Sequence, residues 1–346
     1  MQALKKTTER SCRLPPASFS TNRLNTESKL KPVIVICAPT ACGKTAFAEA
    51  LFACDAQSPF AGTAEVVSAD SMQVYRGFNI GTAKPSADLC KRLPHHLIDI
   101  CSPFAQFGAG DFVREALSCC ERIYERGKLP LIVGGTGFYI RNFIYGLPPT
   151  PRADSAVREQ IERRMQKEGA QKLWNELALS DPVSAKKIHV HDEYRIKRAL
   201  EVRAASGKPL SDFALKPKAR DGFRFLILSL QKSRAELYES IDRRAETMFA
   251  EGLADEVKTL IACGSKPTDP AMQAIGYREF FTESGAFNPD TQAVKERVKK
   301  DSRAYAKRQQ TFFKSFTDAV LLPAEDTAGG IKKIGEFLKG GFDVLD

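Results

Sequence analysis

The chain has 346 residues, of which 43% are hydrophobic and 27% are charged, as in soluble globular proteins of one large domain or two ordinary ones. Its longest unbroken apolar stretch, Val33 to Ala38, is far shorter than the roughly 20 residues that cross a membrane. We therefore expect a soluble protein with no membrane partner. The net charge of +10 fits a polyanionic partner such as nucleic acid, and it equally fits solubility alone.

Cysteines and histidines show no metal-site pattern. The nine cysteines include no Cys-x-x-Cys pair, and the four histidines form two close pairs, His95/His96 and His189/His191, away from any cysteine cluster. An odd number of cysteines without a secretion signal indicates reduced thiols, so we expect a cytoplasmic protein. We interpret the histidines and cysteines as structural.

The first 31 residues carry seven Lys or Arg and two Glu, with many Ser and Thr and little apolar periodicity. This composition predicts a disordered basic tail at residues 1–31. A mitochondrial transit peptide shares the basic, Ser-rich composition and is the alternative, although Glu9 and Glu27 count against it.

Strands alternate with helices in the first half of the chain. Strands are predicted at residues 33–37, 65–69 and 130–133, and helices at 46–53 and 109–126. This alternation predicts an α/β fold, with a mostly parallel sheet and helices on both faces. Ligands of such sheets bind at the carboxyl ends of the strands. Lys44, Asp70 and Thr136 each follow a strand, so we expect them to converge there.

The pattern changes after Tyr145. The breaker-rich segment 146–151 predicts a stiff hinge, and residues 146–222 read as an inserted all-helical domain. The sheet resumes at 223–230, helices fill 233–263 and 290–316, and a last strand is expected at 319–322. The predicted division is therefore a P-loop α/β core of residues 32–145 and 223–325, the helical insertion, and a C-terminal tail of residues 326–346.

A Walker A sequence follows the first strand: Ala38, Pro39, Thr40, Ala41, Cys42, Gly43, Lys44 and Thr45. Backbone N–H groups at such a loop and helix N-terminus surround phosphate oxygens, the Lys adds charge, and the Thr hydroxyl can bind Mg²⁺. Ala38 stands where this motif usually has glycine, so we expect a right-handed backbone at that position.

No acidic residue follows the strand at 130–133, where many P-loop enzymes carry one to support the metal. Asp70 follows the strand at 65–69 instead. It is a candidate general base or metal ligand, and the alternative is a cap at a strand-to-helix turn.

Five ordered blocks closely resemble signatures of the tRNA dimethylallyltransferase family, and together they cover roughly residues 33–316. They are residues 68–85, 134–139, 198–202, 273–278 and 305–311. Two departures are Ala38 and Phe312, which stands where the family usually has Trp. The chain also lacks the C-terminal Cys/His zinc finger of eukaryotic relatives and resembles the compact bacterial type.

The resemblance implies transfer of a dimethylallyl group from dimethylallyl diphosphate to the exocyclic amine of the adenosine on the 3′ side of the anticodon in tRNA. Asp70 would accept the proton of that poor nucleophile. The loop from Ala38 to Thr45, Lys44 and Mg²⁺ would stabilise the departing diphosphate. Arg244 would lie near the diphosphate, although a surface arginine on a helix is nearly as good an interpretation. The target base would flip into a pocket.

By the same resemblance, tRNA contacts are expected from the core and from the helical insertion. They are Asp70, Ser71, Met72, Gln73, Thr136, Arg158, Tyr194, Arg195, Ile196, Lys197, Arg198, Gln273, Ala274, Ile275, Gly276, Tyr277 and Arg278. Arg195 and Arg198 are spaced to bridge adjacent phosphates from one helix face. The basic helix near 295–314 is a second candidate for binding the tRNA backbone. We expect a monomer.

Two other functions share the Walker A loop. One is a P-loop phosphotransferase acting on a nucleotide or small metabolite, and the other is a nucleotide-switched RNA-binding protein without transfer chemistry. Neither explains the block that begins at Ser68. Release of diphosphate that depends on tRNA would favour the transferase, and hydrolysis of ATP or GTP would favour the alternatives.

Overall fold

The computed structural model describes residues 30–151, 154–214 and 218–339. Residues 1–29 of the predicted N-terminal tail lie outside this range, and Lys31 already belongs to the first strand. Within the described part of the chain, no helix has the length and apolar character needed to cross a membrane.

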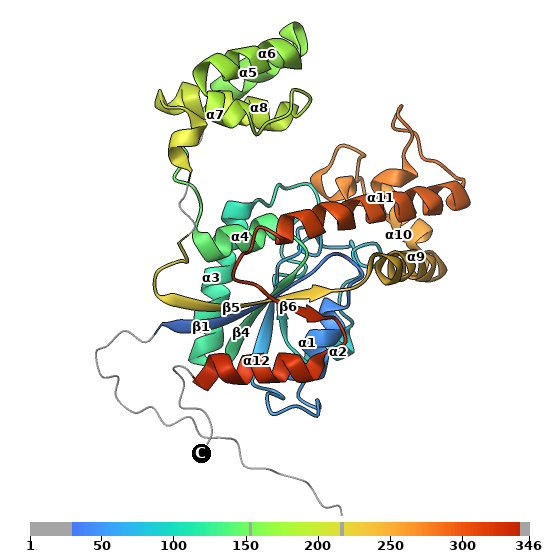
Figure 1. The fold of residues 1–346 in the computed structure, drawn as a ribbon. Helices are drawn as coiled ribbons and strands as arrows, with labels where there is room; N and C mark the ends of the chain where they lie inside the picture. The colour runs from blue at the N-terminus through green and yellow to red at the C-terminus, as the bar shows by residue number, and fades with distance from the viewer. Residues whose placement is uncertain (1–29, 152–153, 215–217, 340–346) are drawn as a thin grey trace, which may run out of the picture.

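A single six-stranded parallel sheet forms the centre of the molecule (Figure 1). Its spatial order is β3-β2-β4-β1-β5-β6. The strands are β1 Lys31–Cys37, β2 Ala64–Ser68, β3 His95–His96, β4 Leu129–Gly134, β5 Phe223–Gln231 and β6 Val320–Pro323. The predicted α/β fold with a parallel sheet is confirmed. The two-residue β3 was not predicted, because so short a segment carries no period-2 pattern.

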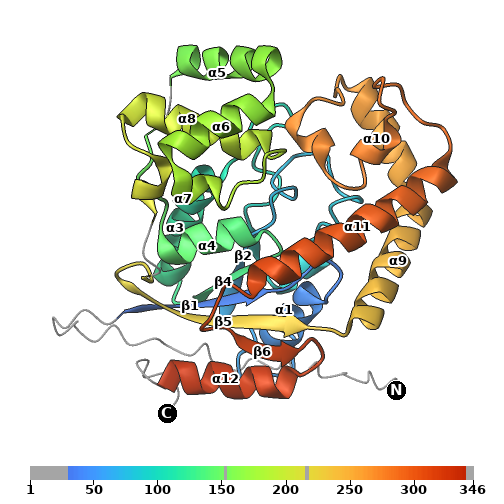
Figure 2. The same cartoon turned by 45° about the horizontal axis from the view of Figure 1, so that its top comes forward.

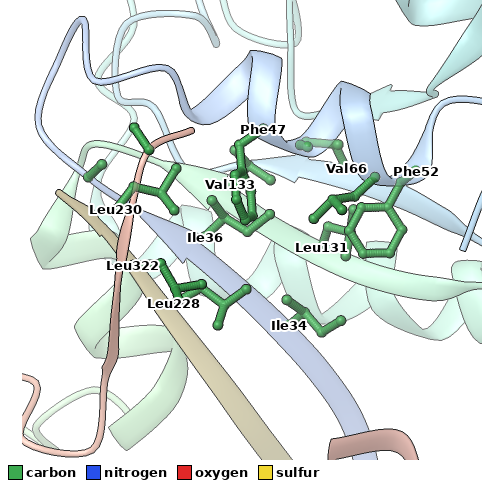
Figure 3. Close-up of a cluster of buried hydrophobic side chains, with 14 of the residues drawn as sticks. Ile34, Ile36, Phe47, Phe52, Val66, Leu131, Val133, Leu228, Leu230 and Leu322 are labelled. Atoms are coloured by element: carbon green, nitrogen blue, oxygen red, sulfur yellow. The ribbon is translucent and has the colours of Figure 1, made fainter. Parts of the chain in front are cut away.

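Both faces of the sheet are buried, which explains why its strands are nearly continuous apolar runs. On β1, Ile34 and Ile36 point to the face covered by α1 (Lys44–Phe52) and α12 (Thr327–Lys339), as Figure 3 shows for the strand side chains and Phe47. Val33 and Val35 point to the opposite face, under α3 (Ala109–Glu125) and α4 (Gly137–Tyr145). Alternate side chains of one strand thus enter two separate cores.

The expected C-terminal tail is wrong for residues 327–339, which form α12. Ile334 is fully buried among the side chains of the first core, and a Cβ on Gly330 would come within 2.6 Å of the Phe47 ring. Three glycines in the helix obscured it in the sequence, since glycine is a poor helix former. Burial of one apolar face on the sheet offsets that low propensity.

Four helices between α4 and β5 form a separate cluster, α5 Ser155–Glu168, α6 Ala170–Ser180, α7 Pro182–Ala185 and α8 Glu193–Ser206. They have their own core, which includes Ile161, Leu173 and Ile196. Asp154 and Asp192 cap α5 and α8 by accepting hydrogen bonds from Val157 N at 2.8 Å and Arg195 N at 3.1 Å. In Figure 1 this cluster stands apart from the sheet.

Arg220 joins the two ends of this helical segment. Its backbone N–H donates to Ile144 O at 2.7 Å, and its guanidinium donates to the carbonyls of Phe143 and Asn142 at 2.9 and 3.1 Å. These carbonyls belong to the last turn of α4, where carbonyls commonly need partners from outside the helix, and Asn142 O also accepts from Gly146 N at 3.1 Å. The chain therefore leaves the core and returns to it at the same place.

The C-terminal half adds a second all-helical region beside the sheet, α9 Arg234–Ala250, α10 Leu253–Ala262 and α11 Thr291–Phe313. It packs around Val74, Tyr75 and Phe78, in the long connection after β2 that also contains α2 (Ala87–Arg92). Figure 2 shows α9, α10 and α11 grouped on the opposite side of the sheet's carboxyl edge from α5, α6 and α8.

Candidate functional site

The Walker A loop connects the end of β1 to α1 through two left-handed residues, Ala41 at φ 59° and Gly43 at φ 95°. Ala38 has no such conformation, in agreement with the expected right-handed backbone there. Ala41 is a strained position, since a left-handed residue with a Cβ costs about 1–2 kcal/mol. No side chain caps the N-terminus of α1. Such a turn before an uncapped helix N-terminus directs N–H groups at an anion.

Lys44 is half-buried and donates to the carbonyls of Ala38 at 3.0 Å and Pro39 at 2.8 Å. Burial, and then the neighbouring Arg244, lower the pKa of Lys44 to about 8. Asp70 acts in the opposite direction. Because burial and a second cation disfavour the charged form of Lys44, a bound anion would stabilise that charged form.

Asp70 lies at the end of β2 and is fixed by its own turn. Its Oδ1 accepts hydrogen bonds from Met72 N at 2.9 Å and Gln73 N at 3.3 Å. Asp70 thus caps a turn, and the helix that the alternative placed after it does not form, since residues 71–74 are a turn and the next helix is α2 (Ala87–Arg92). Thr136, after β4, accepts from Ser71 N at 3.0 Å, so the ends of β2 and β4 are tied together.

Arg244 projects from α9 to the Walker A loop, where its Nη1 donates to Thr40 Oγ1 at 3.2 Å. Burial lowers the pKa of Arg244, and Asp70 partly opposes this shift. An arginine remains charged under these conditions. The site therefore contains two cations, Lys44 and Arg244, within electrostatic range of one carboxylate.

Asp70 and Arg244 line one cavity of about 310 Å³ at the carboxyl edge of the sheet, whereas Lys44 and Thr136 are not among its lining residues. The cavity brings together the loop residues Thr40 and Ala41, the Asp70–Met72 segment, Arg244, and residues from the 273–278 block. One wall of the cavity is apolar: α9 and α11 contribute Ile241, Ala245, Met248 and Val298 to it. The convergence expected from the strand ends is present in the fold.

A second, larger cavity of about 960 Å³ lies between the helical insertion and the start of α3. Arg158, Tyr194, Lys197 and Arg198 line it, together with Arg163, Gly108 and several glutamates. Lys197 is paired with Glu162 at 2.7 Å. Arg198 donates to Thr150 Oγ1 and Pro151 O, both at 3.2 Å, and so anchors the hinge.

Several predicted contact residues do not present their side chains to either cavity. Ile196 and Tyr277 are fully buried, so their side chains cannot touch an RNA in this conformation. The Gln73 carboxamide accepts from Ser68 Oγ and donates to Thr82 O and Ala83 O. Cys42 is buried and donates to Leu230 O at 3.6 Å, which fits a structural role. Arg195 is exposed and pairs with Asp192 at 3.4 Å.

Three of the seven basic residues of α11 form ion pairs within the protein. Lys295 and Lys299 pair with Glu246, and Arg303 approaches Asp242 at 3.3 Å. Arg297, Lys300, Lys307 and Arg308 form no ion pair with the described residues, so α11 remains the second candidate for binding the tRNA backbone.

Three cavity or supporting residues were not predicted as site residues. Tyr305 and Arg308 line the smaller cavity, and Gln309 bonds the Walker A loop directly. All three lie in the 305–311 block, but the sequence of that block does not show which face of the helix contacts the Walker A loop.

No cluster of three or more acidic, histidine or cysteine side chains suited to a metal occurs in the part of the chain that the structure describes. Thr45 is exposed in the first turn of α1, next to Lys44. The protein donors near the loop are hydroxyl and carboxylate oxygens, the types that a hard cation prefers.

Comparisons with known proteins match this architecture. A family model described as IPP transferase matches residues 73–316. A relative from Geobacter sulfurreducens, named tRNA dimethylallyltransferase, is 43% identical over 296 residues, which span 85% of this chain and 91% of the relative. A crystal structure of a tRNA isopentenylpyrophosphate transferase from Bacillus halodurans is 35% identical with a TM-score of 0.61, and the match covers 90% of this chain and 97% of that one. A structure described as a eukaryotic dimethylallyltransferase acting on tRNA has a TM-score of 0.69 at 26% identity, over 88% of this chain and 77% of that one.

Proposed function

This chain belongs to the IPP transferase family, and from that premise we propose that it transfers a dimethylallyl group from dimethylallyl diphosphate to tRNA. The acceptor is the exocyclic amine of the adenosine on the 3′ side of the anticodon, and diphosphate is released. The observation that carries this proposal is the 310 Å³ cavity, in which a Walker A loop, Arg244 and Asp70 face one another. We expect a monomeric, cytoplasmic enzyme.

The chemistry follows from these three groups. The amine nitrogen forms a bond to the first carbon of the dimethylallyl chain, and the bond from that carbon to the diphosphate oxygen breaks with its electron pair. Asp70 accepts the proton that the amine loses, because it lines the cavity and its Oδ1 is held in place by two backbone N–H groups. Lys44, Arg244 and the loop N–H groups stabilise the charge that develops on diphosphate. The apolar wall suits the prenyl chain.

We propose Mg²⁺ as the cofactor. Thr45 would hold the ion through its hydroxyl oxygen, a donor type that this hard cation prefers. When bound, the ion adds positive charge beside the leaving diphosphate.

The decisive test measures diphosphate release from dimethylallyl diphosphate with and without tRNA, together with the mass of the anticodon-loop nucleosides. We expect release only with tRNA, in a 1:1 ratio to prenylated adenosine. ATP hydrolysis without prenylation would favour the phosphotransferase or the nucleotide-switched protein instead.

The reduced pKa of Lys44 predicts a pH-dependent affinity for the diphosphate. The charged lysine binds the anion, so binding is strongest below the free-protein pKa of about 8. Above it, affinity falls by up to about tenfold per pH unit, because binding must first reprotonate the amine. The phosphate groups themselves titrate near pH ~6, well below this range.

Isothermal titration of dimethylallyl diphosphate between pH 7 and 10 measures this dependence. Lys44→Arg is the matched control, since a guanidinium stays charged throughout this range. A wild-type affinity that does not change with pH would contradict the assignment of Lys44 to the anion.

We further propose that the helical insertion, residues 146–222, holds the tRNA backbone through Arg158, Arg195 and Arg198. Each arginine should neutralise about one phosphate, so replacing Arg158 or Arg195 by Ala should reduce the slope of log K against log salt by ~0.9 or somewhat less. Arg198→Ala should also loosen the hinge, since it bonds Thr150 and Pro151.

A salt series of tRNA binding for the three variants checks this expectation. The control is Lys332→Ala, on α12 across the sheet from the insertion (Figure 1). Affinity for dimethylallyl diphosphate alone should not change in any of them. If the salt slopes of all three variants equal that of the wild type, the insertion does not bind the tRNA backbone, and α11 becomes the better candidate for that role.

A further inference from the structure

Gln309, on the inner face of α11, bridges two loops that are distant in the sequence. Its Oε1 accepts a hydrogen bond from Thr40 N at 2.8 Å, and its Nε2 donates to Gly135 O at 2.7 Å. The side chain is only 6% exposed. One carboxamide therefore satisfies a donor of the Walker A loop and an acceptor of the loop after β4.

The fit between α11 and the second loop depends on two glycines. A Cβ on Gly135 would lie 2.5 Å from Gln309 Nε2, and a Cβ on Gly137 would lie 2.4 Å from the Phe312 ring. Both distances are far shorter than real carbon contacts allow. Because glycine has no Cβ, one turn of α11 can pack directly against the loop backbone at these two positions. The position of Gln309 is thus fixed by the packing of its helix.

Thr40 is held from two directions. Gln309 takes its N–H, and Arg244 donates to its hydroxyl at 3.2 Å. The next residue, Ala41, has the strained left-handed backbone at φ 59° that opens the turn around the anion site. A strained conformation persists only where its surroundings hold it. The hydrogen bond from Thr40 to Gln309 is the backbone anchor immediately before this turn.

We propose that Gln309 is a positioning residue for the diphosphate loop, which it holds in the anion-receiving shape through Thr40 while keeping the Thr40 N–H for the protein rather than for phosphate. This inference rests on the proposed function, since it takes the Walker A loop as the site of dimethylallyl diphosphate. It assigns Gln309 no contact with the substrate.

The first test compares Gln309→Met with Gln310→Met, the matched control at the next position of the same helix. Methionine has nearly the length of glutamine but cannot donate or accept in this geometry. We expect Gln309→Met to weaken binding of dimethylallyl diphosphate by about tenfold or more, because a buried donor and acceptor lose their partners. Affinity for tRNA should stay within about twofold, and Gln310→Met should resemble wild type.

The second test uses Gln309→Glu and pH. The ionised carboxylate of this variant can accept a hydrogen bond from Thr40 N–H, but its second oxygen would lie next to Gly135 O, where two acceptors repel. The protonated acid can instead donate its O–H to Gly135 O, as the glutamine amide does. Burial raises the pKa of such a carboxyl group, which brings its protonation into an accessible range. The ratio of wild-type to Gln309→Glu affinity for dimethylallyl diphosphate should therefore shrink as pH falls from 8 to 5.5, while the ratio for Gln309→Met stays constant.

Wild-type affinity of Gln309→Met for dimethylallyl diphosphate would overturn the inference. So would equal losses of diphosphate and tRNA affinity combined with a pH-independent Gln309→Glu ratio, which would indicate general damage to packing. Should Gln309→Met fail to fold, the Gln309→Glu series decides alone. Failure of the wild-type protein to bind dimethylallyl diphosphate would instead refute the proposed function.

Discussion

Asp70→Asn is expected to reduce single-turnover transfer by ~10²–10⁴, the usual loss when a general base is removed. The structure indicates that this variant keeps the local backbone hydrogen bonds. Oδ1 of Asp70 accepts from Met72 N and Gln73 N, and the amide oxygen of asparagine can accept the same two hydrogen bonds. The turn is therefore retained, and the variant loses only the second carboxylate oxygen and the charge.

The measurement is rapid mixing of enzyme, dimethylallyl diphosphate and tRNA, with prenylated adenosine quantified over time. Affinity for tRNA should stay within a few-fold of wild type, and Asp255→Asn on the surface of α10 should be unaffected. Transfer by Asp70→Asn within about threefold of wild type would remove Asp70 from the role of base and leave it as a cap.

Lys44→Ala is expected to reduce affinity for dimethylallyl diphosphate by about 10- to 150-fold, as expected when a hydrogen bond to a charged group is lost. The Lys44 amine donates to Ala38 O and Pro39 O, so it already contacts the loop that should receive phosphate. Affinity for tRNA should not change, because the arginines proposed to bind tRNA lie on α5 and α8. This pattern is the reverse of that expected for the arginine variants.

Calorimetric titration of each ligand against Lys44→Ala and Lys332→Ala separates these expectations. Lys332 is an exposed lysine of α12, so its variant controls for the loss of one positive charge. If Lys44→Ala binds dimethylallyl diphosphate as tightly as Lys332→Ala does, the Walker A loop is not the diphosphate site, and Arg244 would need another explanation.

The sequence by itself determined the class of fold and the family. The buried strand before Gly43, the helix after it, and the strands that end at Ser68 and Gly134 are local patterns, so their elements form close to the predicted bounds. Since the carboxyl ends of parallel strands share one edge, the convergence of the Walker A loop and Asp70 also followed from order alone.

Tertiary structure decided which side chains face the cavity. Ile196 and Tyr277 lie in stretches that the family resemblance assigns to tRNA contacts, yet both are buried, because a stretch of sequence does not specify which face of its element points inward. The glycine-rich α12 forms only because the sheet offers a face on which Ile334 is buried.

The hydrogen bonds of Gln309 join residues 269 and 174 positions apart in the chain. No local propensity encodes such a contact. It exists because Gly135 and Gly137 let α11 approach the backbone of the β4 loop, and that approach brings one carboxamide between two strand ends. Local sequence thus determines the strands and the loop chemistry, while packing between distant helices determines the shape in which the loop is held.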